Sequence, residues 1–211
     1  MLSLFGLILF SPVLIAVTLL IRSENSGPVF YRGVKVGQYG YPFRIFKFRT
    51  MVLDAENIRG PSTADDDPRI TKVGRFIRKY KLDELPQLIN VLKGEMSFFG
   101  PRPEVQHYVD MFTEEEKSIL SVRPGITDWA SLWNPDEGAI LAGSPDPEKA
   151  YMEKIRPKKI ALLLKYVHER SFWTDLKIIF LTFQASARPQ SAAVRKLRMV
   201  QDPQRSREPF S

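Results

Sequence analysis

The sequence of 211 residues contains no cysteine and only two histidines. The absence of cysteine excludes disulfide bonds, thiolate catalysis and cysteine-based zinc sites. His107 and His168 have no serine, aspartate or metal-binding partner at an informative spacing, so we interpret both as structural. The scattered glycines form no phosphate-cradling motif. A protein that faces the cytoplasm fits the absence of cysteine, because disulfide bonds are rare there.

The formal net charge is +7, but most of the chain has only a small excess of positive charge. From Ala185 onward six Lys and Arg residues stand against two Asp and Glu residues, which assigns +4 to the tail and about +3 to the first 184 residues. We predict that residues 185–211 form a basic, flexible tail. The mildly basic body suits anionic lipid or small phosphorylated ligands, and we expect no nucleic-acid partner.

Charge is absent from residues 1–21, a long apolar run that ends at Arg22. About 20 such residues can span a bilayer as one helix. A cleaved signal peptide is not expected, because no basic region precedes the run. Pro12 interrupts it, removes a backbone donor and destabilises a helix interior by about 3 kcal/mol. The hydroxyl of Ser11 is placed to satisfy the carbonyl that the proline frees.

Two membrane topologies are open for this run. Its periodicity alone favours a kinked helix that spans the bilayer. The alternative is a helix-break-helix hairpin that enters and leaves by the same leaflet, with arms of about ten residues that are too short to span at about 1.5 Å per residue. Basic residues after the run place the rest of the chain on the cytoplasmic side. We therefore divide the chain into a membrane segment (1–22), a cytoplasmic catalytic domain (23–184) and the tail.

Residues 27–51 alternate in polarity and are rich in β-forming residues, which predicts a strand-turn-strand hairpin. In its second strand Lys47 and Arg49 share one face, while Phe46 and Phe48 share the other. We expect a short helix over 52–59 and a surface loop over 60–67.

The remainder of the sequence predicts helices with short connections, so the expected fold class is α+β. Gly94 is a good residue to end the helix expected over 83–93, and Thr113 with Glu116 forms a capping box for the helix expected over 113–120. Pro157 is expected to bend the helix over 148–170. This helix and the one expected over 172–183 mix Lys and Arg with aromatic residues, which suits either ordinary core-facing helices or amphipathic helices lying in the headgroup plane. The expected helices cover 72–80, 83–93, 113–120, 148–170 and 172–183, with a turn at 144–147.

Asp83 and Glu84 are adjacent carboxylates at the expected start of a helix. Neighbouring helical residues point about 100° apart, so both reach one site most easily at a helix end. The positive end of a helix favours an ionised carboxylate and a nearby phosphate. Asp83 is then a candidate nucleophile or metal ligand, with Glu84 as its acid-base or orienting partner. The alternative is structural: Asp83 caps the helix and Glu84 interacts with its dipole.

Several expected elements before and after Asp83 and Glu84 carry basic residues that could accompany them. Lys47, Arg49, Arg78 and Arg102 are candidate phosphate ligands, because guanidinium groups suit bidentate phosphate binding. Arg102 lies between two prolines, which reduce the entropy lost in fixing its direction. Residues 123–127 are interpreted as a turn; contact with a ligand or ordinary turn chemistry is open for the residues at its end.

The chain resembles the bacterial sugar transferases of the monotopic phosphoglycosyl transferase family. The resemblance covers nearly everything before the tail. It is carried by these stretches: Ser11-Pro12; Gly27-Pro28-Val29-Phe30; Lys47-Phe48-Arg49-Thr50-Met51; Leu82-Asp83-Glu84-Leu85-Pro86-Gln87; Gly100-Pro101-Arg102-Pro103; Arg123-Pro124-Gly125-Ile126-Thr127; and Arg170-Ser171-Phe172-Trp173.

The resemblance implies transfer of a sugar 1-phosphate from a UDP-sugar to a polyprenyl phosphate, with Mg²⁺ and with release of UMP. It implies that Asp83 attacks phosphorus to form a covalent phosphosugar intermediate and binds the metal, with Glu84 as its partner. The family's basic positions fall on Lys47, Arg78 and Arg102, while Arg49 belongs to the motif with a less defined role.

The same resemblance favours the re-entrant hairpin, with its break at Ser11 and Pro12, over the spanning helix. It implies contact with membrane lipids, a place on the cytoplasmic face of the bacterial inner membrane, and a homodimer as one assembly. One stretch departs from many relatives. After the turn at 123–127 they have Gly, an aromatic residue, Ala and Gln, where this chain has Asp128-Trp129-Ala130-Ser131. Donor preference therefore does not transfer from those relatives. A catalytically silent membrane scaffold is the alternative, and a UMP-release assay distinguishes the two.

Overall fold

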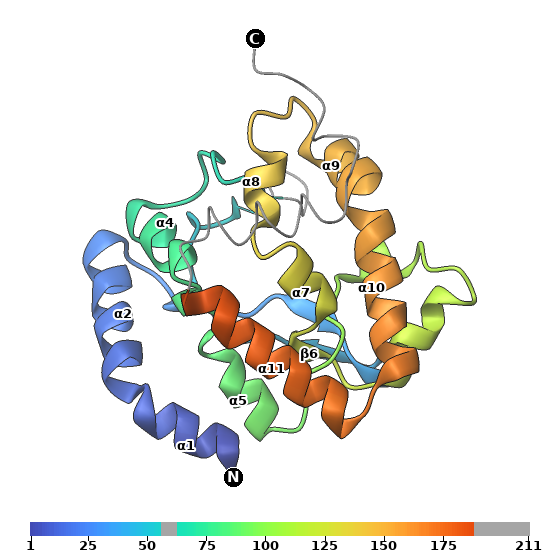
Figure 1. Ribbon diagram of the computed structural model, residues 1–211. Coiled ribbons are helices and arrows are strands. Elements are labelled where there is room, and N and C mark those ends of the chain that lie inside the picture. The colour runs from blue at the N-terminus through green and yellow to red at the C-terminus, as the bar shows by residue number, and fades with distance from the viewer. Residues whose placement is uncertain (56–62, 188–211) are drawn as a thin grey trace.

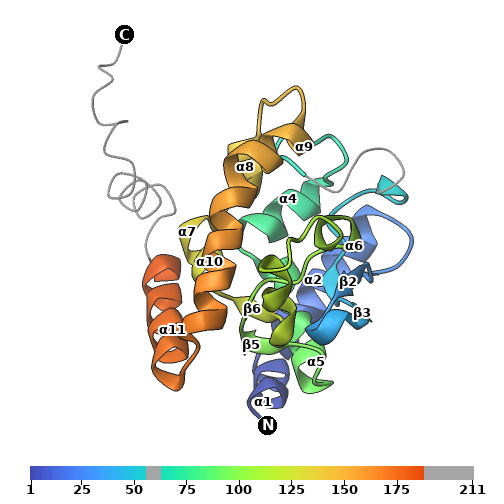
Figure 2. The same ribbon diagram turned by 90° about the vertical axis from the view of Figure 1, so that its right-hand side faces the viewer.

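A computed structural model of the chain describes residues 1–55 and 63–187. It combines many helices with small sheets, as the α+β prediction expected (Figures 1 and 2). The α-helices are α1 (Leu2–Leu9), α2 (Ser11–Glu24), α4 (Lys72–Lys79), α5 (Gln87–Leu92), α6 (Gln106–Val109), α7 (Trp129–Trp133), α8 (Glu137–Leu141), α9 (Pro147–Ala150), α10 (Arg156–Glu169) and α11 (Phe172–Ala187). The strands are β1 (Phe30–Tyr31), β2 (Val34–Val36), β3 (Pro42–Arg44), β4 (Lys47–Phe48), β5 (Ser97–Phe99) and β6 (Gly125–Thr127). Tighter turns are η1 (Gln38–Gly40), η2 (Leu82–Glu84) and η3 (Glu116–Ser121), and η4 (Tyr151–Ile155) is π-helical.

The apolar N-terminal run is broken at the predicted position. Helices α1 and α2 meet at an angle of 57°, and no single helix of the described ranges is both long and apolar enough to cross a bilayer. The Ser11 hydroxyl donates a hydrogen bond of 2.8 Å to the carbonyl of Ile8. That carbonyl is the one that Pro12, four residues later, leaves without its helical donor. The carbonyl at the bend is therefore satisfied by a side chain.

The inner face of α2 is attached to the elements that carry the predicted site. Val17 and Ile21 are buried against Phe48 of β4 and Ile77 of α4. The carboxylate of Glu24, the last residue of α2, accepts hydrogen bonds from the backbone N–H groups at the start of α4. Helix α2 is thus packed onto the rest of the protein instead of being joined to it by a free linker.

The predicted β-hairpin over residues 27–51 is present as two antiparallel ladders. β1 pairs with β4, and β2 pairs with β3. The predicted helix over 52–59 lies largely outside the described residues; at its start Asp54 is in a turn with φ of 58°. The predicted surface loop over 60–67 is also only partly described. At its end Asp67 is buried and accepts forked hydrogen bonds from Arg69, which corrects the expectation of a surface position.

Helix α4 confirms the prediction for residues 72–80, and Thr71 caps it by accepting a hydrogen bond from the N–H of Gly74. The single helix predicted over 83–93 is wrong. A 3₁₀ turn, η2, comes first and the separate helix α5 begins after Pro86, while Lys81 before η2 is in the left-handed region at φ of 55°. Gly94 follows α5 with φ of 78°, as expected for a residue that ends a helix.

Residues 123–127 were expected to form a turn, and this expectation is also wrong. Gly125–Thr127 is strand β6, which pairs in parallel with β5. The pairing is unusually close, because a Cβ atom at Gly125 would lie 2.2 Å from the backbone nitrogen of Gly100. Only glycine permits two backbones to approach in this way.

The predicted helix over 148–170 is a nearly continuous run of α9, η4 and α10, with the π-helical segment next to Pro157. The capping box at Thr113 and Glu116 is confirmed, although the segment that follows is a 3₁₀ turn. Helix α10 is a core-facing helix, since Ile160 and Leu163 are buried in the main apolar cluster. Helix α11 extends the prediction for 172–183 to residue 187, which includes the first three residues of the predicted tail; residues 188–211 lie outside the description.

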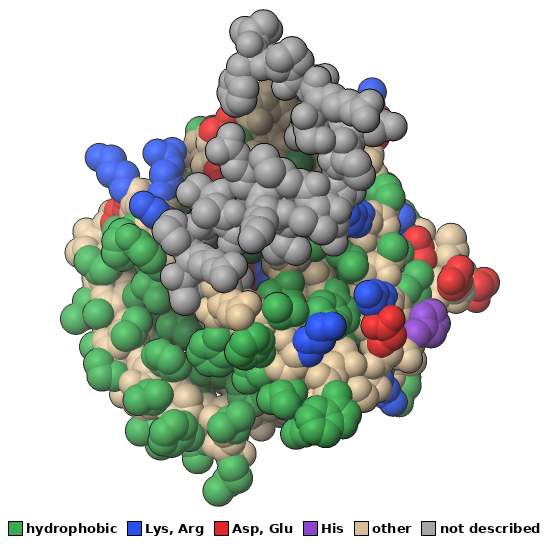
Figure 3. Space-filling model, in the orientation of Figure 1, with side chains coloured by type: hydrophobic (Ala, Val, Ile, Leu, Met, Phe, Trp, Pro, Cys, Tyr) green, Lys and Arg blue, Asp and Glu red, His purple; other side chains and the backbone are tan. Residues whose placement is uncertain are grey.

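Helix α11 leaves much of its apolar side exposed. Phe172 and Trp173 are each 74% exposed, and Phe180 and Phe183 on the same helix are also exposed. Many apolar side chains of α1 and α2 are exposed as well. Figure 3 shows hydrophobic side chains gathered over the left and lower part of one face, over α1, α2 and α11. This surface is named the apolar face below.

Candidate active site

The carboxylates of Asp83 and Glu84 lie together around one cation. Lys47 Nζ lies 2.9 Å from Asp83 Oδ2 and 3.3 Å from Glu84 Oε1. The tight 3₁₀ turn η2, which begins after the left-handed Lys81, brings both side chains within reach of β4. Asp83 caps neither η2 nor α5, which begin after Lys81 and Pro86. The structural alternative of simple helix capping is therefore wrong for this residue.

Arg102 binds Glu84 with both arms of its guanidinium group. Nη1 donates a hydrogen bond of 3.1 Å to Glu84 Oε2, and Nη2 donates to Oε1. Burial alone would raise the pKa of Glu84, but the charges of Arg102 and Lys47 outweigh it and hold that pKa well below its usual range. Glu84 is thus a fixed anion that orients Arg102 and Lys47 beside Asp83.

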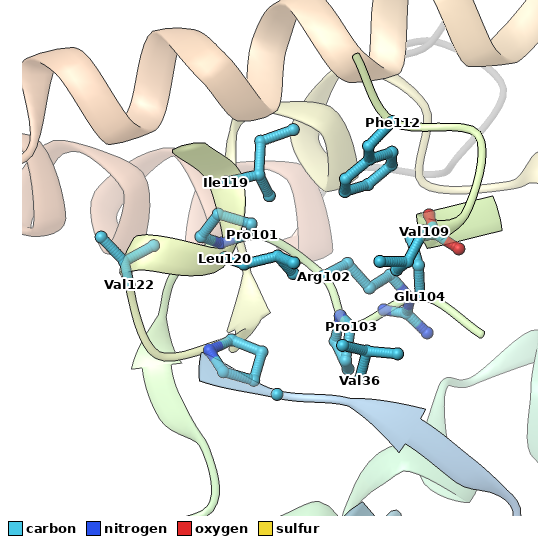
Figure 4. A pocket seen from close by; sticks show the side chains of 12 residues that line it. Val36, Pro101, Arg102, Pro103, Glu104, Val109, Phe112, Ile119, Leu120 and Val122 are labelled. Atoms are coloured by element: carbon cyan, nitrogen blue, oxygen red, sulfur yellow. The ribbon is translucent and has the colours of Figure 1, made fainter. Parts of the chain in front are cut away.

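The Pro-Arg-Pro loop that carries Arg102 is held by packing and by Asp128. Figure 4 shows Phe112, Ile119 and Leu120 gathered against this loop, where they leave a cavity of only about 20 Å³. The fully buried carboxylate of Asp128 accepts a hydrogen bond of 3.1 Å from the backbone N–H of Arg102. Its other oxygen caps α7 by accepting from the N–H of Ser131. Asp128 therefore positions the loop, a role that the motif alone left open.

Arg78 approaches the pair from α4. Its Nε donates a hydrogen bond of 2.9 Å to the hydroxyl of Thr50, which follows β4. Burial lowers the pKa of Arg78, while the charge of Asp83 opposes that shift. The guanidinium group accordingly lies within electrostatic reach of the nucleophile candidate.

Arg49 lies at a different place. Its guanidinium group donates hydrogen bonds to the carbonyls of Asn25 and Ser26, at the end of α2. Gly27 makes room for it, since a Cβ atom there would lie 2.6 Å from Arg49 Nη1. The structure therefore gathers Lys47, Arg78 and Arg102 around the two carboxylates. It directs Arg49 to the segment that follows α2.

One oxygen of Asp83 has no partner within residues 1–55 and 63–187. Asp83 is only 2% exposed, and among the described residues its Oδ1 atom makes no hydrogen bond. An orphaned buried carboxylate oxygen fits a bound cation or a reacting group. The described residues contain no cluster of three or more side chains of the metal-binding types. Mg²⁺ commonly binds through one or two carboxylates together with substrate phosphates, so the unpartnered oxygen of Asp83 fits Mg²⁺.

Three charged residues near the site were not predicted as functional. Lys35 on β2 interacts electrostatically with Glu104, Arg102 and Lys47, and burial lowers its pKa to about 8. Glu104 forms an ion pair with Lys159, which is 5% exposed on α10. The only sequence signal was the position of Glu104 two residues after Arg102. Spacing alone does not distinguish a buried lysine such as Lys159 from the exposed lysines of the same helix.

The site can therefore hold an anion between several cations and present a carboxylate oxygen to it. Such an arrangement stabilises the negative charge that develops when a nucleophile attacks a phosphoryl group. The exposed histidines His107 and His168 take no part in it.

Comparison with known proteins identifies the family. A family model described as bacterial sugar transferase matches residues 1–189. The chain belongs to the bacterial sugar transferase family. It is 38% identical over 182 residues to the UDP-glucose:undecaprenyl-phosphate glucose-1-phosphate transferase of Escherichia coli (strain K12), a match that covers 83% of this chain and 36% of that protein.

Two further relatives are similar to the same degree. The UDP-N-acetylgalactosamine-undecaprenyl-phosphate N-acetylgalactosaminephosphotransferase of Aeromonas hydrophila is 38% identical over 179 residues, covering 83% of this chain and 39% of that protein. The uncharacterized sugar transferase EpsL of Bacillus subtilis (strain 168) is 38% identical over 180 residues, covering 85% and 80% respectively. The chain thus spans well under half the length of the first two relatives and most of the third.

Proposed function

We propose that this protein transfers a sugar 1-phosphate from a UDP-sugar to a polyprenyl phosphate and releases UMP. The names of two relatives state this type of reaction with UDP-glucose and with UDP-N-acetylgalactosamine as donors. The observation that carries the proposal is the buried carboxylate of Asp83, whose Oδ1 atom has no partner among the described residues and whose neighbours are cations. The product would begin the assembly of a lipid-linked glycan.

In the first step an oxygen of Asp83 attacks the phosphorus that carries the sugar. A bond forms between this oxygen and phosphorus, the bond from phosphorus to the bridging oxygen breaks, and UMP leaves with that oxygen. Lys47, Arg78 and Arg102 stabilise the charge that the phosphate oxygens gain. Glu84 holds Arg102 and Lys47 in place, and its lowered pKa keeps it ionised throughout.

In the second step an oxygen of the polyprenyl phosphate attacks the same phosphorus. The aspartyl–phosphorus bond breaks, the polyprenyl diphosphate sugar leaves, and Asp83 is restored as a carboxylate. A covalent intermediate lets one small site serve a water-soluble donor and then a lipid acceptor.

Asp83 would hold Mg²⁺ together with the donor's phosphates, since its Oδ1 atom has no partner among the described residues. When bound, the ion supplies Lewis-acid polarisation of the phosphoryl oxygens. The residues of this chain then exclude water, since Asp83 lies in a buried position, and they fix the direction of attack.

The bent pair α1 and α2 supports a re-entrant hairpin as the membrane anchor. Each arm is short, with 8 residues in α1 and 14 in α2. The bend of 57° turns them away from one straight path. We infer that both ends of the hairpin lie on the cytoplasmic face of the bacterial inner membrane.

The exposed aromatic residues of α11 would lie in the headgroup region beside the hairpin. Contact with membrane lipids thus belongs to the proposal. Pairing of two copies into a homodimer stays a prediction.

UMP release from the donor alone tests the covalent step. Wild-type protein mixed with UDP-sugar and no acceptor should release about one UMP per protein, and Asp83→Asn should release none. Asp110→Asn, a matched change at an exposed position, should behave like wild type. Full activity of Asp83→Asn would exclude Asp83 as the nucleophile. Absence of UMP release from the wild type with any UDP-sugar would instead favour the silent scaffold.

A further inference from the structure

An open pocket of about 330 Å³ lies between the start of the β5–β6 ladder and the junction of α10 with α11. None of the residues Lys47, Asp83, Glu84 and Arg102 lines it, so it is separate from the candidate active site. Its polar lining residues are Ser97, Arg123, Tyr166, Arg170, Ser171 and Asp175.

Two arginines give this pocket its charge. Arg123 and Arg170 are both exposed, and within the described part of the chain neither guanidinium group makes a hydrogen bond or an ion pair. This distinguishes them from Arg69, Arg102 and Arg156, whose guanidinium groups are paired with carboxylates. The pocket therefore presents two cationic forks that are free to take an anion.

The single acidic residue of the pocket is already engaged. Asp175 accepts a hydrogen bond of 2.8 Å from the hydroxyl of Tyr166. Burial and the charge of Asp175 raise the pKa of Tyr166, so this phenol stays a neutral donor. Two arginines against one aspartate leave the pocket with a net positive charge.

The position of the pocket indicates where its anion comes from. Arg170 and Ser171 directly precede Phe172 and Trp173, which are each 74% exposed and begin the apolar side of α11. The turn between α10 and α11 lies at the same end of the molecule as α1 in both views (Figures 1 and 2). Paired aromatic residues beside arginines are typical of the level of lipid headgroups, where the rings enter the interface and the cations meet phosphate.

We propose that the Arg123–Arg170 pocket binds the phosphodiester headgroup of an anionic membrane lipid. The proposal rests on the membrane attachment in the proposed function and adds a lipid site outside the catalytic centre. The bound headgroup would fix the first turn of α11 against the membrane. The helix pair α1 and α2 would fix the other part of the apolar face. Charge complementarity and continuity with this face favour a lipid over a soluble anion.

Binding of short-chain lipids to the full-length protein in detergent tests this site. Isothermal titration with dihexanoyl phosphatidylglycerol should give saturable binding, and dihexanoyl phosphatidylcholine should bind more weakly because its choline cation opposes the arginines. Arg123→Gln/Arg170→Gln should weaken phosphatidylglycerol binding about tenfold or more. Arg123→Lys/Arg170→Lys, which keeps the charge, should lose less.

The matched control is Lys149→Gln/Lys154→Gln, which removes two exposed charges from α9 and η4. Helix α9 lies at the end of the molecule opposite the α10–α11 turn (Figures 1 and 2). This variant should bind phosphatidylglycerol like wild type. Binding by Arg123→Gln/Arg170→Gln within twofold of wild type would overturn the proposal. Equally tight binding of inorganic phosphate would also overturn it, because the lipid would then add nothing to the ion.

Donor-only UMP release separates this site from the proposed function. Arg123→Gln/Arg170→Gln should keep wild-type UMP release in detergent while it loses the lipid. If the variant loses lipid binding and the wild type releases no UMP, the lipid site is supported and the proposed reaction is contradicted. If the variant keeps lipid binding and the wild type releases UMP, the lipid site alone is contradicted.

Discussion

Lys159 Nζ lies 2.8 Å from Glu104 Oε1, and Glu104 follows Arg102 by two residues. Helix α10 carries neither carboxylate of the candidate site, yet it fixes the loop that brings Arg102 to Glu84. Burial alone would lower the pKa of Lys159, but Glu104 and Glu137 reverse this and raise it well above its usual value. The ion pair therefore stays charged across the physiological pH range.

Lys159→Met should destabilise the protein by about 3 kcal/mol, because it removes the ion-pair partner of the buried Glu104 and leaves only the charges of Lys35 and Arg102 near it. Adding Glu104→Gln should recover part of the loss, since the orphaned charge is then removed. The free energy of unfolding in denaturant measures both effects. Lys154→Met, an exposed change on the preceding helical turn, is the control and should cost little. Equal stability of the single and double variants would contradict the coupling.

Arg102→Lys should lower turnover about a hundredfold while the fold persists, because lysine keeps the charge and loses the two-armed contact with Glu84. Initial rates of UMP release measure the loss, and thermal unfolding checks the fold. Arg156→Lys is a matched control, since Arg156 makes a similar contact with Glu116 at a remote place. If both variants lose turnover alike, the effect of Arg102 is structural.

The apparent KM for the UDP-sugar should rise as pH increases through about 8. Lys35 has its pKa lowered to about 8, so its cation is present below this pH and lost above it. Its charge acts with Arg102 and Lys47 on an incoming diphosphate, and Glu104 and Lys159 face it from the other elements. Lys35→Met should have a higher KM at pH 7 and no rise near pH 8. A rise of the same size in Lys35→Met would assign it to another group.

Both ends of the hairpin should react only from the cytoplasmic face. The sequence of 211 residues has no cysteine, so Leu2→Cys and Asn25→Cys each introduce a single reactive thiol. A membrane-impermeant maleimide should label both in inverted vesicles and neither in intact spheroplasts. In the Leu2→Cys background Pro12→Ala removes the break and should favour a spanning helix with residue 2 outside. Labelling of Leu2→Cys from outside without that change would restore the spanning topology.

Local signals predicted several elements correctly. The Ser11-Pro12 break, helix α4 and the Thr113–Glu116 capping box follow from residue chemistry within one turn of the chain. The cations Lys47, Arg78 and Arg102 were assigned to the site by resemblance to a family, and the fold brings them around the carboxylates from separate elements.

Long-range contacts account for what the sequence did not predict. Strand β6 is three residues long and begins at a glycine, so its pairing with β5 leaves no alternating pattern. The left-handed backbone of Lys81, which separates η2 from the preceding helix α4, has no composition signal. The direction of Arg49 toward the carbonyls of Asn25 and Ser26 depends on where α2 ends in space.

The hydrogen bond from Ser11 to the carbonyl of Ile8 stabilises the bend between α1 and α2. A proposed anchor of this shape occupies a single monolayer and never meets the far one. Its depth is then set by the headgroups on one side alone, so membranes of different thickness would leave the candidate carboxylates Asp83 and Glu84 at the same height. The enzyme would accordingly work unchanged when a bacterium lengthens or shortens its acyl chains.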